Sequence, residues 1–258
     1  MRTGSPLPPS THLQHTLSQI QGWLLSCQEN HTKCQESTPY TPHRLIDIMG
    51  EDSSKVKLVE VSSNEHPPQY ACLSHCWGKT RSKHTTWQST IRENLEGIPV
   101  SQLPKTFRDA IAIARVLHIR YLWVDSLCIV QDSASDWAKH VSKMAQIYQH
   151  GLLTLAAGAS SDDDGGFFAE VPEKWKTQYR FQLDVEDAQY EFHCRHVVDH
   201  PDAGWPCKET LPLMERGWCF QERLLSKRYL CFGSKEVLWE CQEDVACSCS
   251  TGVGSFST

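Results

Sequence analysis

A glutamate in an aromatic, cationic stretch is the first feature of this 258-residue chain that could support chemistry. The stretch ERGWCFQERLLSKRYLCF, residues 215–232, is predicted to form a helix followed by a strand. On that helix Trp218 and Glu222 are four residues apart and share one face, which Arg216 and Arg223 flank. Two interpretations stay open. Glu222 forms a surface ion pair worth less than about 1 kcal/mol, or it stabilises a cationic, oxocarbenium-like group in a cleft.

Asp125 is a second candidate carboxylate, because it directly follows the apolar run YLWV. The end of a buried strand is a typical position for an active-site acid, and a turn or cap residue fits equally well. The sequence contains neither the GxxxxGK[ST] nor the GxGxxG pattern, so it offers no glycine-rich phosphate loop.

The segment LSHCWG, residues 73–78, combines a hydroxyl, an imidazole, a thiol and an indole at the end of a predicted strand. Gly78 permits a tight turn after Ser74 and Trp77. A nucleophilic pair of His75 and Cys76 is conceivable. Adjacent strand residues point to opposite faces, however, which disfavours that pair.

A third group has the residue types of a metal site. Cys27, His31 and Cys34 follow the pattern C-x3-H-x2-C, and this spacing lets all three approach one ion. The alternative is a helix end with free thiols. A tetrahedral zinc site needs a fourth ligand, which we expect from the C-terminal cysteines Cys241, Cys247 or Cys249, and we predict Cys247.

Composition narrows the class of protein. Hydrophobic residues make up 40% of the chain and charged residues 22%, as in ordinary globular proteins. The formal net charge of −6 argues against a nucleic-acid-binding protein. No apolar stretch approaches the roughly 20 residues that span a bilayer, and the N-terminus lacks a signal-peptide core. We therefore expect a cytoplasmic protein without a membrane partner, whose 12 cysteines are mostly reduced thiols.

The elements that must position these residues follow from the hydrophobic pattern. Helices are predicted for residues 12–29, 103–119 and 133–151, and apolar strands for 69–76, 120–130, 152–160 and 228–233. Further strands are predicted for 42–48, 55–61 and 236–241. The alternation from 69 to 232 predicts an α/β domain with a mainly parallel sheet flanked by helices. Ligands of such sheets bind outside the carboxyl ends of the strands, at residues 74–79, 125–132 and 158–161 here.

The same pattern suggests the domain limits. Residues 1–11 are rich in Pro, Ser and Thr and are predicted to be disordered, and residues 12–250 to form a single domain. Within it, residues 160–214 are interpreted as an insertion with a hairpin near 179–195. Residues 251–258 are expected to be frayed.

Three blocks resemble the motifs of the heterokaryon incompatibility (HET) domain of filamentous fungi. They are YACLSHCWG, LPKTFRDAIAIARVLHIRYLWVDSLCIVQD and RGWCFQERLLSKRYLCF. The preceding segments WLLSCQENHTKC and PHRLIDI resemble the usual run-in to that domain, so the resemblance covers about residues 20–250. His75 stands where the family more often has Tyr. The resemblance implies a role in nonself recognition and regulated cell death.

HET domains are in turn similar to Toll/interleukin-receptor (TIR) domains, which have a flavodoxin-like fold. The order LSHCWG, WVD, helix, LLTLAAGAS and WCFQE is similar to the TIR order, with residues 160–214 interrupting the match. In enzymatic TIR domains the glutamate of the last motif cleaves NAD+, which implies this role for Glu222. The residues implied to bind the nucleotide are Ser74, Trp77, Gly78, Asp125, Trp218 and Arg223.

The implied chemistry needs only one carboxylate. Nicotinamide leaves as a neutral ring, and an ionised glutamate stabilises the oxocarbenium-like ribose. An unperturbed pKa of about 4.3 would keep Glu222 charged at neutral pH, and Trp77 or Trp218 could stack on a base. The expected partners are the nucleotide substrate and, through self-association or heterotypic contacts, immune-type signalling proteins. The alternatives are a non-catalytic signalling module and a zinc-stabilised scaffold with neither role.

Overall fold

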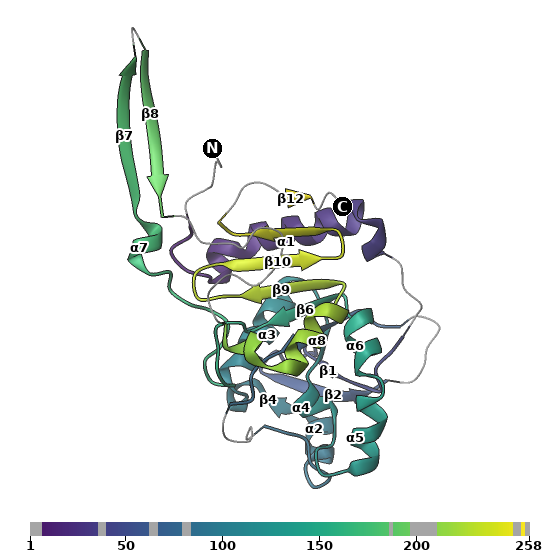
Figure 1. Cartoon of the computed structure of the whole chain (residues 1–258). Coiled ribbons are helices and arrows are strands. Elements are labelled where there is room, and N and C mark those ends of the chain that lie inside the picture. Colours follow the sequence, from purple (N-terminus) through teal and green to yellow (C-terminus); the bar gives the residue numbers. More distant parts are fainter. Residues whose placement is uncertain are drawn as a thin grey trace.

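A ten-stranded sheet forms the centre of the molecule, and helices flank it (Figure 1). The computed structural model describes residues 7–35, 40–61, 67–78, 84–185, 188–196, 211–249 and 254–255. The strands are β1 (Arg44–Asp47), β2 (Lys55–Glu60), β3 (Tyr70–Ser74), β4 (Ile98–Pro99), β5 (Tyr121–Trp123), β6 (Leu153–Ala156), β7 (Gln178–Val185), β8 (Ala188–Arg195), β9 (Arg228–Phe232), β10 (Val237–Cys241), β11 (Asp244–Cys247) and β12 (Gly254–Ser255). The α-helices are α1 (Leu13–Asn30), α2 (Ile91–Glu96), α3 (Lys105–Val116), α4 (Asp125–Cys128), α5 (Ala134–Val141), α6 (Met144–His150), α7 (Glu173–Lys176) and α8 (Gly217–Leu225). Short 3-10 helices are η1 (Thr32–Cys34), η2 (Val100–Gln102) and η3 (Pro212–Glu215).

The centre of the sheet is parallel. The strand order is β12-β11-β10-β9-β6-β3-β5-β1-β2-β4. The four neighbours β9, β6, β3 and β5 run parallel, and the outer strands pair antiparallel on both sides. Parallel neighbours need crossover connections, which contain α3 between β3 and β5, and α4 to α6 between β5 and β6. The predicted α/β fold with a parallel central sheet flanked by helices is confirmed.

Burial explains why the sequence forms these strands. Every residue of β3, β6 and β9 is buried, as expected for parallel strands covered on both faces. In β2, near the sheet edge, buried Val56 and Leu58 alternate with exposed lysines. A continuous apolar run thus marks the centre of the sheet, and alternation marks its edge.

Helix α1 packs against strand β10 (Figure 1). Its buried residues Ile20, Leu24 and Cys27 recur at helical spacing. The indole rings of Trp23 and Trp239 lie 6.3 Å apart across this contact. The first predicted helix is therefore observed. Its packing on β10 brings the beginning of the chain into contact with one of its last strands.

The apolar run at residues 120–130 is only partly a strand, which corrects the prediction of one long strand. Strand β5 ends at Trp123, and the short helix α4 begins at Asp125. The Asp125 carboxylate accepts a hydrogen bond from the amide of Ser126 at 2.7 Å. Such a local bond competes with the strand ladder, and an apolar run by itself does not distinguish strand from buried helix.

The predicted helix at residues 133–151 is observed as two helices, α5 and α6. It starts as predicted, because the Ser133 hydroxyl accepts a hydrogen bond from the Asp136 amide at 3.3 Å. The break falls at residues 142–143, where the Ser142 hydroxyl donates to the carbonyl of Lys139. This side-chain bond favours the end of α5 over its continuation.

Residues near both ends of the described chain form backbone hydrogen bonds with the rest of the domain. The Thr11 amide donates to the carbonyl of Ala169, and Leu7 is buried. These contacts differ from the disorder predicted for residues 1–11, of which 1–6 lie outside the described residues. Gly254 and Ser255, within the segment expected to fray, pair with β11. The other residues of 250–258 are not described.

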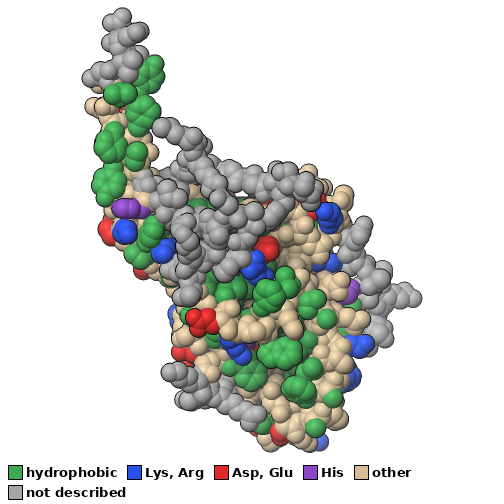
Figure 2. Space-filling view, viewed as in Figure 1, with side chains coloured by type: hydrophobic (Ala, Val, Ile, Leu, Met, Phe, Trp, Pro, Cys, Tyr) green, Lys and Arg blue, Asp and Glu red, His purple; other side chains and the backbone are tan. Residues whose placement is uncertain are grey.

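The hairpin predicted near residues 179–195 is observed as β7 and β8, a separate two-stranded sheet that projects from the body (Figure 1). Side chains alternate along a strand, so one face of this hairpin is apolar and the other polar. Its apolar face is exposed (Figure 2) and includes Tyr179, Phe181, Leu183, Tyr190 and Phe192. Phe181 lies opposite Phe192, and Leu183 opposite Tyr190. We call this surface the hairpin face.

The hairpin face should contribute little to the stability of the body. We expect the double substitution Phe181→Thr with Phe192→Thr to change the melting temperature by less than about 2 °C. The physical reason is exposure, 55% and 40% for the two rings. Circular dichroism during thermal unfolding measures this shift.

Phe107→Thr is the matched control, because this ring on α3 is only 1% exposed. It should lower the melting temperature by about 6–20 °C. An equally large loss in the hairpin variant would mean that β7 and β8 belong to the cooperative core.

Candidate functional site

Glu222 lies at the carboxyl ends of the parallel strands. Helix α8 buries Glu222 to 7% exposure together with Cys219, three residues before it. The hydroxyl of Ser74, the last residue of β3, donates a hydrogen bond of 2.5 Å to Oε2 of Glu222. A helix that starts far along the chain thus directs its carboxylate onto the edge of the sheet where ligands of α/β proteins bind.

Other predicted site residues surround this carboxylate. The Trp77 indole Nε1 donates to Oδ2 of Asp125 at 3.2 Å, and the charge of Asp125 acts on Glu222. Tyr148, on α6, also hydrogen-bonds to Glu222. The structure therefore brings Glu222, Ser74, Trp77 and Asp125 into one neighbourhood.

Burial changes the acidity of Glu222. Loss of solvent, and to a smaller extent the nearby charge of Asp125, raise the pKa of its carboxyl from 4.5 to about 7. Hydrogen bonds from Ser74 and Tyr148, and the charge of His75, act in the opposite direction. At neutral pH the carboxyl is thus only about half ionised, which corrects the fully charged state expected from an unperturbed pKa.

Asp125 shares this environment. Its side chain keeps partial surface exposure, yet protein atoms surround the carboxyl, and this burial raises its pKa. Hydrogen bonds from the Ser126 amide and the Trp77 indole, with the charges of His75 and Arg216, partly offset the effect. The site therefore contains two neighbouring carboxyls that both resist ionisation.

His75 and Cys76 turn to different surroundings, as predicted, although both follow the end of β3 rather than lying in the strand. The Nε2 of His75 lies 3.1 Å from Oδ1 of buried Asp163. Cys76 packs in a separate apolar cluster with Cys219. An Arg216 Nη1 hydrogen bond of 2.9 Å to the His75 carbonyl fixes this turn to the start of α8.

Sequence reasoning missed two of these residues as parts of the site. Tyr148 lies within the helix predicted for residues 133–151, and Asp163 within the segment interpreted as an insertion. The hydroxyl of a tyrosine at a buried helix position needs a hydrogen-bond partner, and this was the available signal for Tyr148.

Gly78 has the backbone conformation that the predicted turn requires. Its φ is +81°, where residues with side chains are strained. A Cβ at this position would lie 2.9 Å from Cβ of Asp162, so the close approach of the two segments also requires glycine.

Trp218 and Arg223 have different surroundings from the buried Glu222 carboxylate. The buried side of α8 runs through Cys219 and Glu222, an i, i+3 pair, and Trp218 is 58% exposed outside it. The Nε of Arg223 forms an ion pair of 2.6 Å with Oε2 of Glu240 on β10. Trp218 instead joins Phe220 and Leu224 as large exposed apolar residues of α8, which we call the α8 patch.

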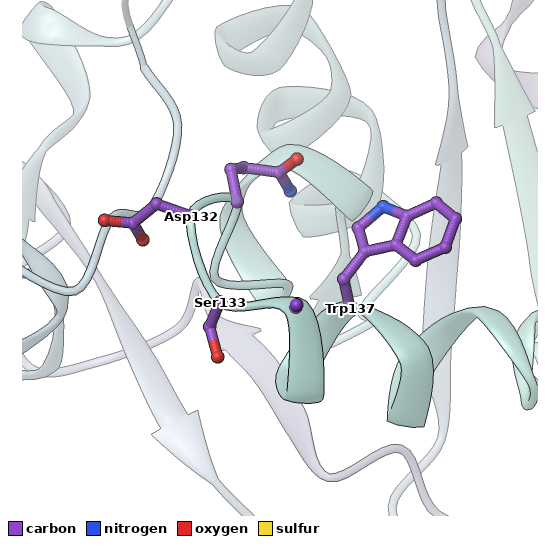
Figure 3. A pocket seen from close by; sticks show the side chains of 5 residues that line it. Asp132, Ser133 and Trp137 are labelled. Atoms are coloured by element: carbon purple, nitrogen blue, oxygen red, sulfur yellow. The ribbon is translucent and has the colours of Figure 1, made fainter.

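A shallow pocket of about 450 Å³ lies at the start of α5 (Figure 3). Its lining includes Gln131, Asp132, Ser133, Ala134 and Trp137. None of the residues around Glu222 contributes to it. Asp132 in this pocket accepts a hydrogen bond from the Gln88 amide at 2.9 Å.

Four side chains form a group that could hold a metal ion. The ligand atoms of Cys27, His31, Cys34 and Cys241 all lie within 4.8 Å of one another. Cys241 ends β10, on which α1 packs, whereas Cys247 ends β11, the next strand outward. The fourth member of this group is therefore Cys241 rather than the predicted Cys247, which belongs to a second group with Glu236 and Cys249.

Within the ranges that the structure describes, no helix combines the length and apolarity needed to cross a membrane. Searches among curated proteins and among solved structures found no match. A family model described as heterokaryon incompatibility protein (HET) matches residues 70–222, more than half of the chain. The match begins at the first residue of β3 and ends at Glu222, so it spans the neighbourhood built above. The chain therefore belongs to the HET family of heterokaryon incompatibility proteins.

Proposed function

We propose that this HET-family protein acts in nonself recognition and regulated cell death by cleaving the nicotinamide–ribose bond of NAD+ or a related nucleotide. One observation carries the proposal: Glu222 is a buried carboxyl with a raised pKa at the carboxyl ends of the parallel strands. Perturbed carboxyls in such positions are typical of catalytic sites. The similarity of WCFQE to the motif of TIR enzymes supports the same role for Glu222.

The reaction requires stabilisation of positive charge on the ribose. The C–N bond breaks with its electron pair leaving on neutral nicotinamide, and the oxygen of a water molecule bonds to the ribose carbon. Ionised Glu222 stabilises the oxocarbenium-like state and accepts the proton that the water loses. A pKa of about 7 suits both tasks, because general bases work best when their pKa lies near the operating pH.

Neighbouring groups have supporting roles in this proposal. Ser74 orients the Glu222 carboxylate through its hydrogen bond. The carboxyls of Asp125 and Glu222, when ionised, favour a substrate whose nicotinamide ring is cationic. Trp77 is only partly buried and can stack on that ring, whereas Trp218 and Arg223 lie outside the proposed binding site.

Substrate entry requires a rearrangement, since Glu222 is only 7% exposed. The α8 patch lies on the same helix as Glu222 and exposes 52–65% of its three apolar side chains. Self-association through this patch would move α8 and open the edge of the sheet. The proposed enzyme is therefore active as an oligomer.

The enzymatic proposal predicts that Glu222→Gln lowers nicotinamide release from NAD+ by at least about 100-fold, because Gln keeps the shape of Glu but cannot become anionic. Chromatography of the products, at protein concentrations that cover monomer and oligomer, measures the rate. Wild-type activity should rise as the pH passes about 7, where Glu222 ionises.

Glu240→Gln is the matched control. This substitution on β10 removes the ion pair with Arg223, which lies on α8 next to Glu222, and it leaves the Glu222 carboxyl in place. Its rate should stay within about twofold of wild type, because a partly exposed pair contributes little. Equal losses in both variants would mean that α8 needs its charges for structure, and the enzymatic proposal would fail.

A second candidate, a non-catalytic signalling module, is favoured by the α8 patch. Exposed aromatic and aliphatic side chains gathered on one helix are typical of protein-binding surfaces. In cells that overexpress the protein, Leu224→Ser would then abolish cell death while Glu222→Gln would still kill without lowering NAD+. The enzymatic proposal requires the reverse for Glu222→Gln.

A further inference from the structure

We propose that Cys27, His31, Cys34 and Cys241 bind one structural Zn²⁺ that fastens helix α1 to strand β10. This site is independent of Glu222 and of the proposed enzymatic activity. It rests on the geometry of the four ligands, on a buried cation beside them, and on the backbone amides that point to their sulfur atoms.

The geometry suits four-coordinate zinc. Zinc–sulfur bonds of about 2.3 Å and zinc–nitrogen bonds of about 2.0 Å place tetrahedral ligand atoms about 3.5–3.8 Å apart. All four ligand atoms here lie within 4.8 Å of one another, and Nδ1 of His31 is 3.2 Å from Sγ of Cys241. Small side-chain rotations therefore bring the four atoms into the zinc coordination sphere.

The local fold holds three ligands in one compact turn. Cys27 is in the last turn of α1, and its carbonyl accepts a hydrogen bond from the His31 amide at 3.2 Å. The His31 carbonyl accepts in turn from the amide of Cys34, in η1. Cys27, Cys34 and Cys241 are buried, so the site is shielded from solvent.

A buried arginine supplies the charge that such a site requires. Arg228 is 4% exposed, and its Nε donates to Sγ of Cys27 at 3.1 Å. Its other hydrogen bonds in the described part of the chain go to the carbonyls of Cys34 and Leu152. Three thiolates and a neutral imidazole around Zn²⁺ leave one net negative charge, which the guanidinium neutralises. With three neutral thiols, none of these hydrogen-bond partners would be an anion, and burial of the cation would be unfavourable.

Backbone amides after Cys241 also point to the ligand sulfur atoms. The amides of Glu243 and Asp244 hydrogen-bond to the sulfur of Cys241, and the amide of Gln242 to that of Cys34. Three successive N–H groups thus point to two of the ligands. Hydrogen bonds of this kind fix the direction of a metal ligand.

The ligand set identifies the metal class and the role. Thiolate and imidazole ligands select zinc over Mg²⁺ or Ca²⁺, which prefer oxygen. Four protein ligands leave no open position for water or substrate, so the ion is structural rather than catalytic. Because such ions contribute binding energy to folding, this one would stabilise the packing of α1 on the sheet.

The first experiment measures metal content. Elemental analysis of the purified wild type should give about one zinc per chain, and Co²⁺ exchanged into the site should show the visible bands of a tetrahedral thiolate complex. Cys34→Ala should weaken zinc binding by at least about 100-fold. Cys128→Ala is the matched control, because Cys128 is also fully buried but lies outside the group, and it should keep the zinc.

A second variant decides the question if Cys34→Ala does not fold. His31→Cys keeps four ligands, so it should retain zinc while the Co²⁺ bands shift toward those of a four-thiolate site. The proposal is overturned if the wild type carries no zinc and shows no thiolate bands with Co²⁺. It is also overturned if peptide mapping finds a disulfide between two of the three cysteines, or if Cys128→Ala loses the metal as fully as Cys34→Ala.

Discussion

At pH 7.5 the Glu222→Gln variant should be more stable than the wild type by about 2–3 kcal/mol, a rise in melting temperature of about 4–12 °C. The reason is that the fold buries a group that ionises freely in the unfolded chain. Burial raises the pKa of Glu222 from 4.5 to about 7. Glutamine has nearly the same shape and can accept the Ser74 hydrogen bond. It does not ionise in the unfolded chain, so its burial carries no such penalty.

The sign of the pH dependence follows from the raised pKa. Below about pH 4.5 the carboxyl is protonated in both states, so its contribution to stability is fully present. Between about pH 4.5 and 7 the unfolded chain releases the proton while the folded protein keeps it, and stability is lost by about 3 kcal/mol. The difference in free energy of unfolding between Glu222→Gln and the wild type should therefore be small at pH 4.5 and increase up to about pH 7.

Urea unfolding at pH 4.5, 6.0 and 7.5 measures this gap. Glu240→Gln, on the partly exposed ion pair to Arg223, should show no comparable widening. A variant that is less stable than the wild type at every pH would show that the folded protein stabilises the Glu222 anion. Together with the predicted loss of activity, a more stable Glu222→Gln would indicate that this site sacrifices stability for function.

The second large effect is expected at a buried ion pair between β1 and α5. Asp136→Asn should lower the free energy of unfolding by about 3–5 kcal/mol, because it leaves the Arg44 guanidinium without an anionic partner. Arg44 is 3% exposed and donates hydrogen bonds to the Asp136 carboxylate and to the carbonyl of Cys128. The Asp136 carboxylate also accepts from the Val130 amide at 2.8 Å.

Acid should remove the same contribution from the wild type. Burial alone would raise the pKa of Asp136, but the hydrogen bonds from Arg44 and Val130 and the charge of Arg44 hold it below 3.8. A lowered pKa gives stability that is present above pH 3.8 and is lost as the pH falls through the folded-state value. The difference between the wild type and Asp136→Asn should therefore narrow in strong acid.

Asp47→Asn is the matched control for this pair. Asp47 accepts a hydrogen bond of 2.8 Å from Arg120, whose side chain is 56% exposed. Water replaces such a partner, so the expected loss is below about 1 kcal/mol in denaturant unfolding at neutral pH. If Asp47→Asn and Asp136→Asn lose equal free energies of unfolding, burial of Arg44 does not determine how much its ion pair with Asp136 contributes to stability.

The central fold could be predicted because its strands are continuous apolar runs separated by helical patterns. The antiparallel pairing of β1 with β5 could not, since it joins residues far apart in the chain and local pattern does not encode such contacts. The interruption between α5 and α6 depends on one serine hydroxyl, which a hydrophobic pattern ignores.

For the candidate site, residue types were easier to predict than their environments. The positions of Ser74, Trp77 and Asp125 follow from the rule that strand ends gather at one edge. The raised pKa of Glu222 depends on its burial and on the charge of Asp125, which spacing does not reveal. The choice of Cys241 over Cys247 depends on strand order, because both residues end strands of similar composition.

The packing of α1 on β10 has a consequence during synthesis on the ribosome. His31 and Cys241 touch across 210 positions of the chain. At translation rates of about 5–20 residues per second, the first helix therefore waits about 10–40 seconds for the strand that covers its apolar side. During this interval Ile20, Leu24 and Cys27 have no native partner on β10. The nascent chain therefore exposes the apolar side of an amphipathic helix, to which chaperones bind. Slowed translation just before residue 237 should lengthen that exposure and raise the share of newly made chains that aggregate.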